Sequence, residues 1–179
     1  MHECWIYGRI DITLVSCKSL LSDLIYYIRQ ENSNLIFKLN SMIQSVNNLD
    51  YLPPVLSPMD IRATTYEEWV RLINEIVQNS SYEVLLLDLG DGVDDLYHIM
   101  DLCRHIYMPV LKDAVSAAKI KQFENLMQMW DLTPVLSKIE QVKPPFHGCF
   151  ANGEYYAEQL MWSELGDYVR TILRKRDTT

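Results

Sequence analysis

The fold is decided by the stretch Glu83-Val-Leu-Leu-Leu-Asp88-Leu-Gly90-Asp91-Gly92-Val-Asp94-Asp95. Its apolar residues 84–87 run into an acidic residue and then into a Gly-Asp-Gly turn. After the turn, apolar residues recur at helical spacing, at Leu96, Ile99, Met100 and Cys103. This pattern is typical of a buried parallel strand, a tight turn and a helix that packs back on the sheet.

Two acidic residues of this stretch, Asp88 and Asp91, follow the predicted strand. In open α/β sheets, ligands bind outside the carboxyl ends of the strands. Asp88 and Asp91 therefore stand where a magnesium ion or a phosphate group would be held. The alternative is structural: Asp88 only ends the strand, and Asp94 and Asp95 cap the helix. The spacing allows both interpretations.

A second strand, predicted at 106–111, leads directly into Lys112 and Asp113. Proline cannot donate to a sheet ladder, so Pro109 should mark the point where this strand leaves the sheet. If the two strands are neighbours, Lys112 and Asp88 could together hold a phosphoryl group and a metal ion. The alternative is an ordinary helix start with Asp113 as its N-cap.

Strands and helices alternate along the rest of the chain. The patterns predict strands at 10–15, 49–52 and 139–142, a loop at 55–60, and helices at 21–28, 35–46, 65–77, 94–105, 113–130 and 155–174. This alternation predicts the α/β class, as a three-layer α/β/α sandwich with a mainly parallel sheet. No linker-like stretch divides the 179 residues, so we expect a single domain over 1–179.

Composition excludes several classes of protein. The net charge is −8, and the one basic cluster, Arg170, Arg174, Lys175 and Arg176, lies at the C-terminus, so no nucleic acid partner is expected. No apolar run approaches the roughly 20 residues of a transmembrane helix. The four cysteines show no CxxC or metal-site spacing, which indicates free thiols in a cytoplasmic protein.

Familiar catalytic motifs are missing from the sequence. None of the six glycines is followed by lysine, so the phosphate loop GxxxxGK[ST] is absent, and Gly90-Asp-Gly92 stops short of a GxGxxG fingerprint. No serine has the context of a nucleophile elbow. We therefore predict no catalytic residue in this chain.

Residues 82–126, with DLGDGVDDL and IYMPVLKDAVSAAKIKQFENLM, resemble the C-terminal half of ParA/MinD-type ATPases, a SIMIBI-class P-loop family. The closest likeness is to the TadZ/CpaE-like branch found beside Flp/tight-adherence pilus genes. The segments LSDLIYY (21–27), DYLPPVLSPMD (50–60) and ELGDYVR (164–170) are similar to parts of the same proteins. The resemblance covers about residues 21–173.

This resemblance implies roles for the candidate site residues. Asp88 would belong to the Walker B region and help hold magnesium through water. Gly90, Asp91 and Gly92 would match the switch loop that faces the γ-phosphate of ATP. The segment 108–113, with Pro109 and Lys112, would lie near the nucleotide base. The chain departs from the family before residue 20, where the first strand and the Walker A loop are expected to be absent.

The departure implies a non-catalytic ParA/MinD-like localisation or scaffold protein for pilus or secretion machinery. Such a protein would be a cytoplasmic homodimer, recruited by partners to the inner face of the membrane or the cell pole. One alternative is an ATP-dependent dimerisation switch, if a phosphate loop lies upstream. Another is a receiver-like domain with Asp88 as phospho-acceptor and Lys112 as phosphate-sensing cation, although Val15-Ser-Cys17 lacks the acidic pair that receivers need.

Overall fold

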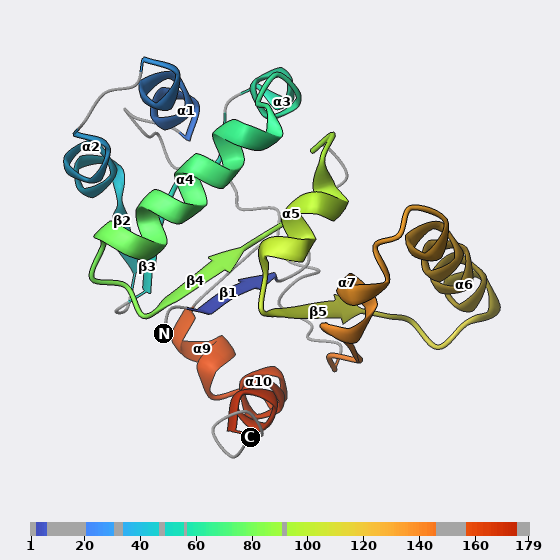
Figure 1. The fold of residues 1–179 in the computed structure, drawn as a ribbon. Coiled ribbons are helices and arrows are strands. Elements are labelled where there is room, and N and C mark those ends of the chain that lie inside the picture. Colours follow the sequence, from blue (N-terminus) through green and yellow to red (C-terminus); the bar gives the residue numbers. More distant parts are fainter. Residues whose placement is uncertain are drawn as a thin grey trace. The chain divides into compact units, whose positions relative to one another are not determined.

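The computed structural model describes residues 3–6, 21–30, 34–46, 49–55, 57–90, 93–145 and 157–174 (Figure 1). The predicted strand at 10–15 lies outside these residues. The helices are α1 (Leu21–Arg29), α2 (Leu35–Met42), α3 (Pro58–Arg62), α4 (Tyr66–Asn79), α5 (Leu96–Leu102), α6 (Ala114–Met129), α7 (Thr133–Ser137), α9 (Ala157–Met161) and α10 (Glu164–Arg174). The strands are β1 (Glu3–Ile6), β2 (Gln44–Val46), β3 (Leu49–Tyr51), β4 (Val84–Leu87), β5 (His105–Pro109) and β6 (Ile139–Val142).

The larger sheet has the strand order β4-β1-β5-β6, and β2 and β3 form a separate antiparallel pair. β1 pairs in parallel with β4, with Ile6 opposite Leu87. It also pairs in parallel with β5, where Ile6 lies opposite Ile106. Helices alternating with parallel strands confirm the predicted α/β class.

The strand β1 was not predicted, because four residues next to the N-terminus are too few to show a period of two. Its Cys-Trp-Ile run nevertheless favours a strand, since aromatic and β-branched residues suit a pleated surface. The first strand of the family was expected to be absent, yet a strand precedes residue 20 and lies between β4 and β5.

The chain forms two compact units. The larger comprises residues 1–108 and 112–140, and the smaller comprises 109–111 and 141–179. In the smaller unit, the backbone N–H of Lys143 donates to the hydroxyl of Tyr168 on α10 at 2.8 Å.

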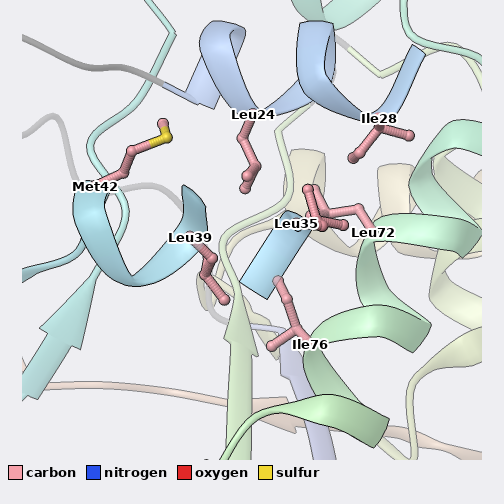
Figure 2. Close-up of a cluster of buried hydrophobic side chains, with 7 residues drawn as sticks. All are labelled: Leu24, Ile28, Leu35, Leu39, Met42, Leu72 and Ile76. Carbon is pink, nitrogen blue, oxygen red and sulfur yellow. The ribbon is translucent and has the colours of Figure 1, made fainter. Parts of the chain in front are cut away.

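One core of the larger unit lies between α1, α2 and α4. Figure 2 shows its buried side chains, and Leu24, Leu39 and Leu72 among them come from three different helices. A capping box, of the sequence form Thr-x-x-Glu, starts α4: the Thr65 hydroxyl accepts from the N–H of Glu68, and the Glu68 carboxylate accepts from the N–H of Thr65. The same carboxylate pairs with the Arg29 guanidinium at 2.8 Å, which ties α1 to the start of α4.

A second core lies between β5, α5, α6 and α7, around Met100, Cys103, Ile106, Met127 and Val135. Leu85 and Leu87 of β4 pack against this core, and Leu85 also contacts the first one. Val84 and Leu86, on the opposite side of β4, are about half exposed. The prediction of a buried strand was therefore wrong for β4, because its described neighbours cover only one face.

Three further predictions of local structure need correction. The segment 55–60 was expected to be a loop, but Ser57 caps the short helix α3, whose first residue is Pro58. The second helix ends at Met42, and Gln44–Val46 turns into a hairpin strand. The predicted helix 155–174 is broken into α9 and α10, because Ser163 starts a new helix: its hydroxyl accepts from the N–H of Gly166.

A polar cluster joins the β2–β3 hairpin to the segment before β4. The Tyr82 hydroxyl donates to Asp50 at 2.6 Å, and the Ser45 hydroxyl donates to the other oxygen of the same carboxylate. These two hydrogen bonds lower the pKa of Asp50. Burial, followed by the hydrogen bond to Asp50 and the charge of Asp50, raises the pKa of Tyr82 to about 12.

The pKa of Tyr82 predicts a pH dependence of stability. Because the folded pKa lies above the ordinary value of 10.0, the contribution of Tyr82 is complete below pH 10 and is lost as the pH rises towards 12. Urea unfolding at pH 8 and pH 11 should therefore show a smaller fall in the free energy of unfolding for Tyr82→Phe than for the wild type. The exposed Tyr26→Phe is the control and should keep the wild-type fall. An equal fall in all three proteins would contradict the prediction.

Candidate functional site

The candidate site lies at the carboxyl edge of the parallel strands. β4, β1 and β5 run in the same direction, and Leu87, Ile6 and Ile106 lie level with one another across them. Asp88 directly follows Leu87, so its backbone leaves the sheet beside the end of β1. This is the edge at which open α/β sheets bind ligands.

The strands that lead to Asp88 and Lys112 are not neighbours. β1 lies between β4 and β5, which places these two strands about 10 Å apart at a spacing of about 4.8 Å per strand. The joint site of Asp88 and Lys112 was predicted on the condition that β4 and β5 pair directly, and the strand order does not meet that condition. The sequence could not show this, because the strand that separates them comes from the N-terminus, about eighty residues earlier.

Asp88 is exposed. Alternation along β4 places it on the same side as Val84 and Leu86, which is the side of the strand with greater exposure. At Gly90, an added Cβ would meet nothing within 4 Å, so its described surroundings do not require glycine. Asp91 and Gly92 lie outside the described residues, and their roles stay predictions.

The other predicted residues lie at the end of β5 and just before the start of α6 along the chain. Pro109 is the last residue of β5, as predicted, and belongs to the smaller unit. Lys112 is exposed and precedes α6. The alternative role of Asp113 is confirmed: it is the N-cap of α6, and its carboxylate accepts from the N–H of Ser116 at 2.8 Å.

The acidic residue at the N-cap of α5 does not cap the helix through its side chain. Asp95 is at the N-cap position, but its carboxylate makes no capping hydrogen bond. It lies 3.8 Å from the Nδ1 atom of His98 instead. The alternative interpretation was that Asp94 and Asp95 cap the helix. It is correct in that Asp95 occupies the N-cap position, and wrong in that the Asp95 side chain makes no capping hydrogen bond.

The described residues of the candidate site do not form a closed cradle for Mg-ATP. In the part of the chain that the structure describes, no group of three or more His, Cys, Asp or Glu side chains could hold a metal ion. The segment 7–20, between β1 and α1, has one glycine, Gly8, and no GK[ST] sequence. One carboxylate, such as that of Asp88, would neutralise little of the charge of a triphosphate, and phosphoryl transfer depends on that neutralisation.

An exposed face on α6 does not follow from helical spacing. Ile120, Phe123, Met127 and Trp130 recur along the helix at the spacing of a core side, but of these four only Met127 is buried, and Trp130 is 49% exposed. Val115 and Met129 are more exposed still, at 65% and 75%. The composition of α6 contains a signal for this face, because apolar and small residues lie on all sides of the helix. Only one of these sides packs against a core.

A search among solved structures identifies a protein with the same fold. The crystal structure of a ParA family ATPase from Chlorobium tepidum TLS matches with a TM-score of 0.64 and 14% sequence identity, over 94% of this chain and 82% of that chain. The chain therefore has a ParA-like fold. No protein-family model matches the sequence, and no curated protein matches it.

A membrane-spanning helix is not found among the described residues, where each helix is too short or too polar to cross a bilayer.

Proposed function

We propose that this chain is a non-catalytic ParA/MinD-like localisation or scaffold protein of the TadZ/CpaE-like branch, acting as a homodimer in Flp/tight-adherence pilus or secretion machinery. One observation carries the proposal. The fold is ParA-like, but the segment between the central strand β1 and α1 has no phosphate-loop sequence. Such a chain would keep the family's fold and lack the anion cradle needed for hydrolysis.

The proposal includes the finer architecture. Residues 1–179 form one ParA/MinD-like domain, a three-layer α/β/α sandwich with a mainly parallel sheet. The protein is cytoplasmic, binds no nucleic acid and reaches the inner face of the membrane or the cell pole through its partners. The net charge of −8 supports the lack of nucleic acid binding, because phosphate groups are bound by clustered lysine and arginine.

The proposed dimer interface contains the turn 91–95, which follows the carboxyl edge of β4. Family members pair through the face that covers the nucleotide, and Asp94 and Asp95 directly precede α5, with Asp95 at its N-cap position. Light scattering should show a dimer both with and without Mg-ATP. The double variant Asp94→Lys/Asp95→Lys should weaken the dimer. The control is the exposed Asp23→Lys on α1, which makes one Asp→Lys substitution instead of two.

Two results of this experiment would contradict the proposed dimer. The first is a monomer at high protein concentration in both conditions. The second is a dimer that the double variant and the control affect equally, because the turn would then not be the interface.

The ATP-dependent switch is the second candidate function, and the exposed Asp88 at the carboxyl edge favours it. A switch predicts heat on titration with Mg-ATP and release of phosphate, both reduced by Asp88→Asn. The non-catalytic proposal predicts neither heat nor phosphate. The receiver-like alternative predicts amide NMR shifts with beryllofluoride. However, the acidic pair that a receiver needs is found neither in Tyr7-Gly8-Arg9, which follows β1, nor in 15–17.

A further inference from the structure

β4 is an edge strand whose own sequence does little to prevent further pairing. In the sheets that the structure describes, its ladder partner is β1, on one side of the strand. The four residues Val84–Leu87 include no charge and no proline, which are common features that keep an edge strand from pairing with another chain. Val84 and Leu86 are also about half exposed. Protection against strand addition must therefore come from residues outside the strand.

Two exposed carboxylates give part of this protection. Glu83 and Asp88 directly flank the four apolar residues. Charged residues in flanking positions oppose the pairing of one copy of a strand with another, because equal charges then meet at the ends. Both carboxylates lie beyond the ends of the strand, so they do not cover the backbone groups along its length.

The β2–β3 hairpin lies beside the start of β4. Tyr82, two residues before Val84, donates its hydroxyl hydrogen to Asp50 on β3, with an oxygen–oxygen distance of 2.6 Å. Leu52, the residue after β3, packs against the same buried cluster as Leu85 of β4. Figure 1 shows β3 next to the start of β4, on the side away from β1. The hairpin is therefore in position to cover the edge of the strand.

This hairpin covers β4 without extending the sheet. Within the described residues, β3 has a ladder with β2 and none with β4. Pro53 and Pro54 follow Leu52, and neither has an N–H group to donate to a ladder. A two-stranded hairpin of three residue pairs is also too small to be stable by itself. Its position therefore depends on contacts made by side chains.

Asp50 makes the polar contact that holds the hairpin. Its carboxylate accepts hydrogen bonds from Tyr82 and from Ser45, which lies opposite Asp50 on β2. A hydroxyl that donates to a carboxylate at 2.6 Å forms a strong, charge-assisted hydrogen bond. The two hydrogen bonds lower the pKa of Asp50, so its carboxylate is ionised at neutral pH. One side chain thus connects β2, β3 and the start of β4.

We propose that the contact between Asp50 and Tyr82 is a latch that holds the β2–β3 hairpin as a guard over the edge of β4. With the latch closed, the hairpin blocks the addition of an extended segment from another chain. With the latch open, the hairpin moves away and the apolar edge pairs with β4 of a second copy. Repeated pairing of this kind leads to cross-β assembly.

Hydrogen–deuterium exchange of the full chain tests the latch. Tyr82→Phe should speed the exchange of the hairpin and β4 amides about three- to tenfold and leave the core of α1, α2 and α4 unchanged. Tyr51→Phe is the matched control, because the Tyr51 hydroxyl donates to Gln44 within the hairpin, and it should affect the hairpin alone. Tyr82→Phe/Asp50→Asn should exchange no faster than the stronger single variant, because both substitutions remove the same contact.

Thioflavin T fluorescence tests what the latch protects. Tyr82→Phe should shorten the lag before cross-β assembly, and added salt should shorten it further by screening Glu83 and Asp88. Adding Leu86→Lys to this variant places a charge on the edge strand and should restore the wild-type lag. The control is Phe37→Lys in the same variant, which adds an equal charge at another exposed apolar position and should not restore it.

Three results would overturn the proposal. The first is unchanged exchange of the hairpin and β4 in Tyr82→Phe. The second is exchange of β4 that Tyr51→Phe speeds as much as Tyr82→Phe does. The third is no assembly of Tyr82→Phe, or assembly that Phe37→Lys suppresses as well as Leu86→Lys does, because the edge of β4 would then not be the contact.

Discussion

Replacing Leu24 with alanine is expected to lower the free energy of unfolding by about 2–5 kcal/mol. Leu24 is 0% exposed and packs between α1, α2 and α4. The substitution loses the favourable free energy of transferring the missing carbons from water to the core. It also leaves a cavity that the three surrounding helices fill only in part. Urea unfolding followed by circular dichroism measures the change.

The control for Leu24 is Tyr26→Ala on the same helix, because the Tyr26 side chain is 60% exposed. Its replacement should change the free energy of unfolding by less than about 0.5 kcal/mol, as for most surface substitutions. Equal effects of the two variants would contradict the core that Figure 2 shows.

Replacing Gly166 with alanine is expected to disrupt the corner between α9 and α10. An added Cβ would lie 2.3 Å from the backbone oxygen of Met161 and 2.6 Å from that of Leu160. These atoms belong to the backbone, so no side chain can move aside and α9 must shift. Overpacking of this kind costs about 1–3 kcal/mol. Without the contact, alanine in a helix would instead stabilise by about 1 kcal/mol.

Hydrogen–deuterium exchange measures the effect on this corner directly. We expect faster exchange of the amides of α9 and α10 in Gly166→Ala and unchanged exchange in the core formed by α1, α2 and α4. Gly90→Ala is the matched control, since its Cβ would meet nothing within 4 Å. Slower exchange across α9 and α10 in Gly166→Ala would show that the close contact does not exist.

Local patterns predicted the elements whose signal lies within a few consecutive residues. The capping box of Thr65 and Glu68, the N-cap at Asp113 and the end of β5 at Pro109 each follow from the chemistry of one or two side chains. The buried faces of α1 and α4 follow from helical spacing. The start of α3 at Pro58 was missed, because Pro58 was interpreted as a loop residue when it is also suited to a first helical turn.

The candidate site was predicted only as a set of strand ends. Asp88 lies after β4 as expected, but its relation to Lys112 depends on which strand pairs with which. No local pattern encodes that choice. The exposed face of α6 was missed for a similar reason, since helical spacing identifies a regular face and does not reveal whether another element covers it.

Residue propensity, capping and motif spacing act over a few consecutive residues, so the amino-acid sequence alone predicts the α/β class, many helix and strand positions, and the lack of a GxxxxGK[ST] motif within residues 1–179. The folded structure was needed to show that β1 lies between β4 and β5, that Val84 and Leu86 stay half exposed, and that the backbone at Met161 leaves no room for a side chain at Gly166. These features depend on contacts between segments that are distant in the sequence or bent back on one another. Which of these contacts form depends on the free energy of the whole folded chain relative to its alternatives, and not on any one segment.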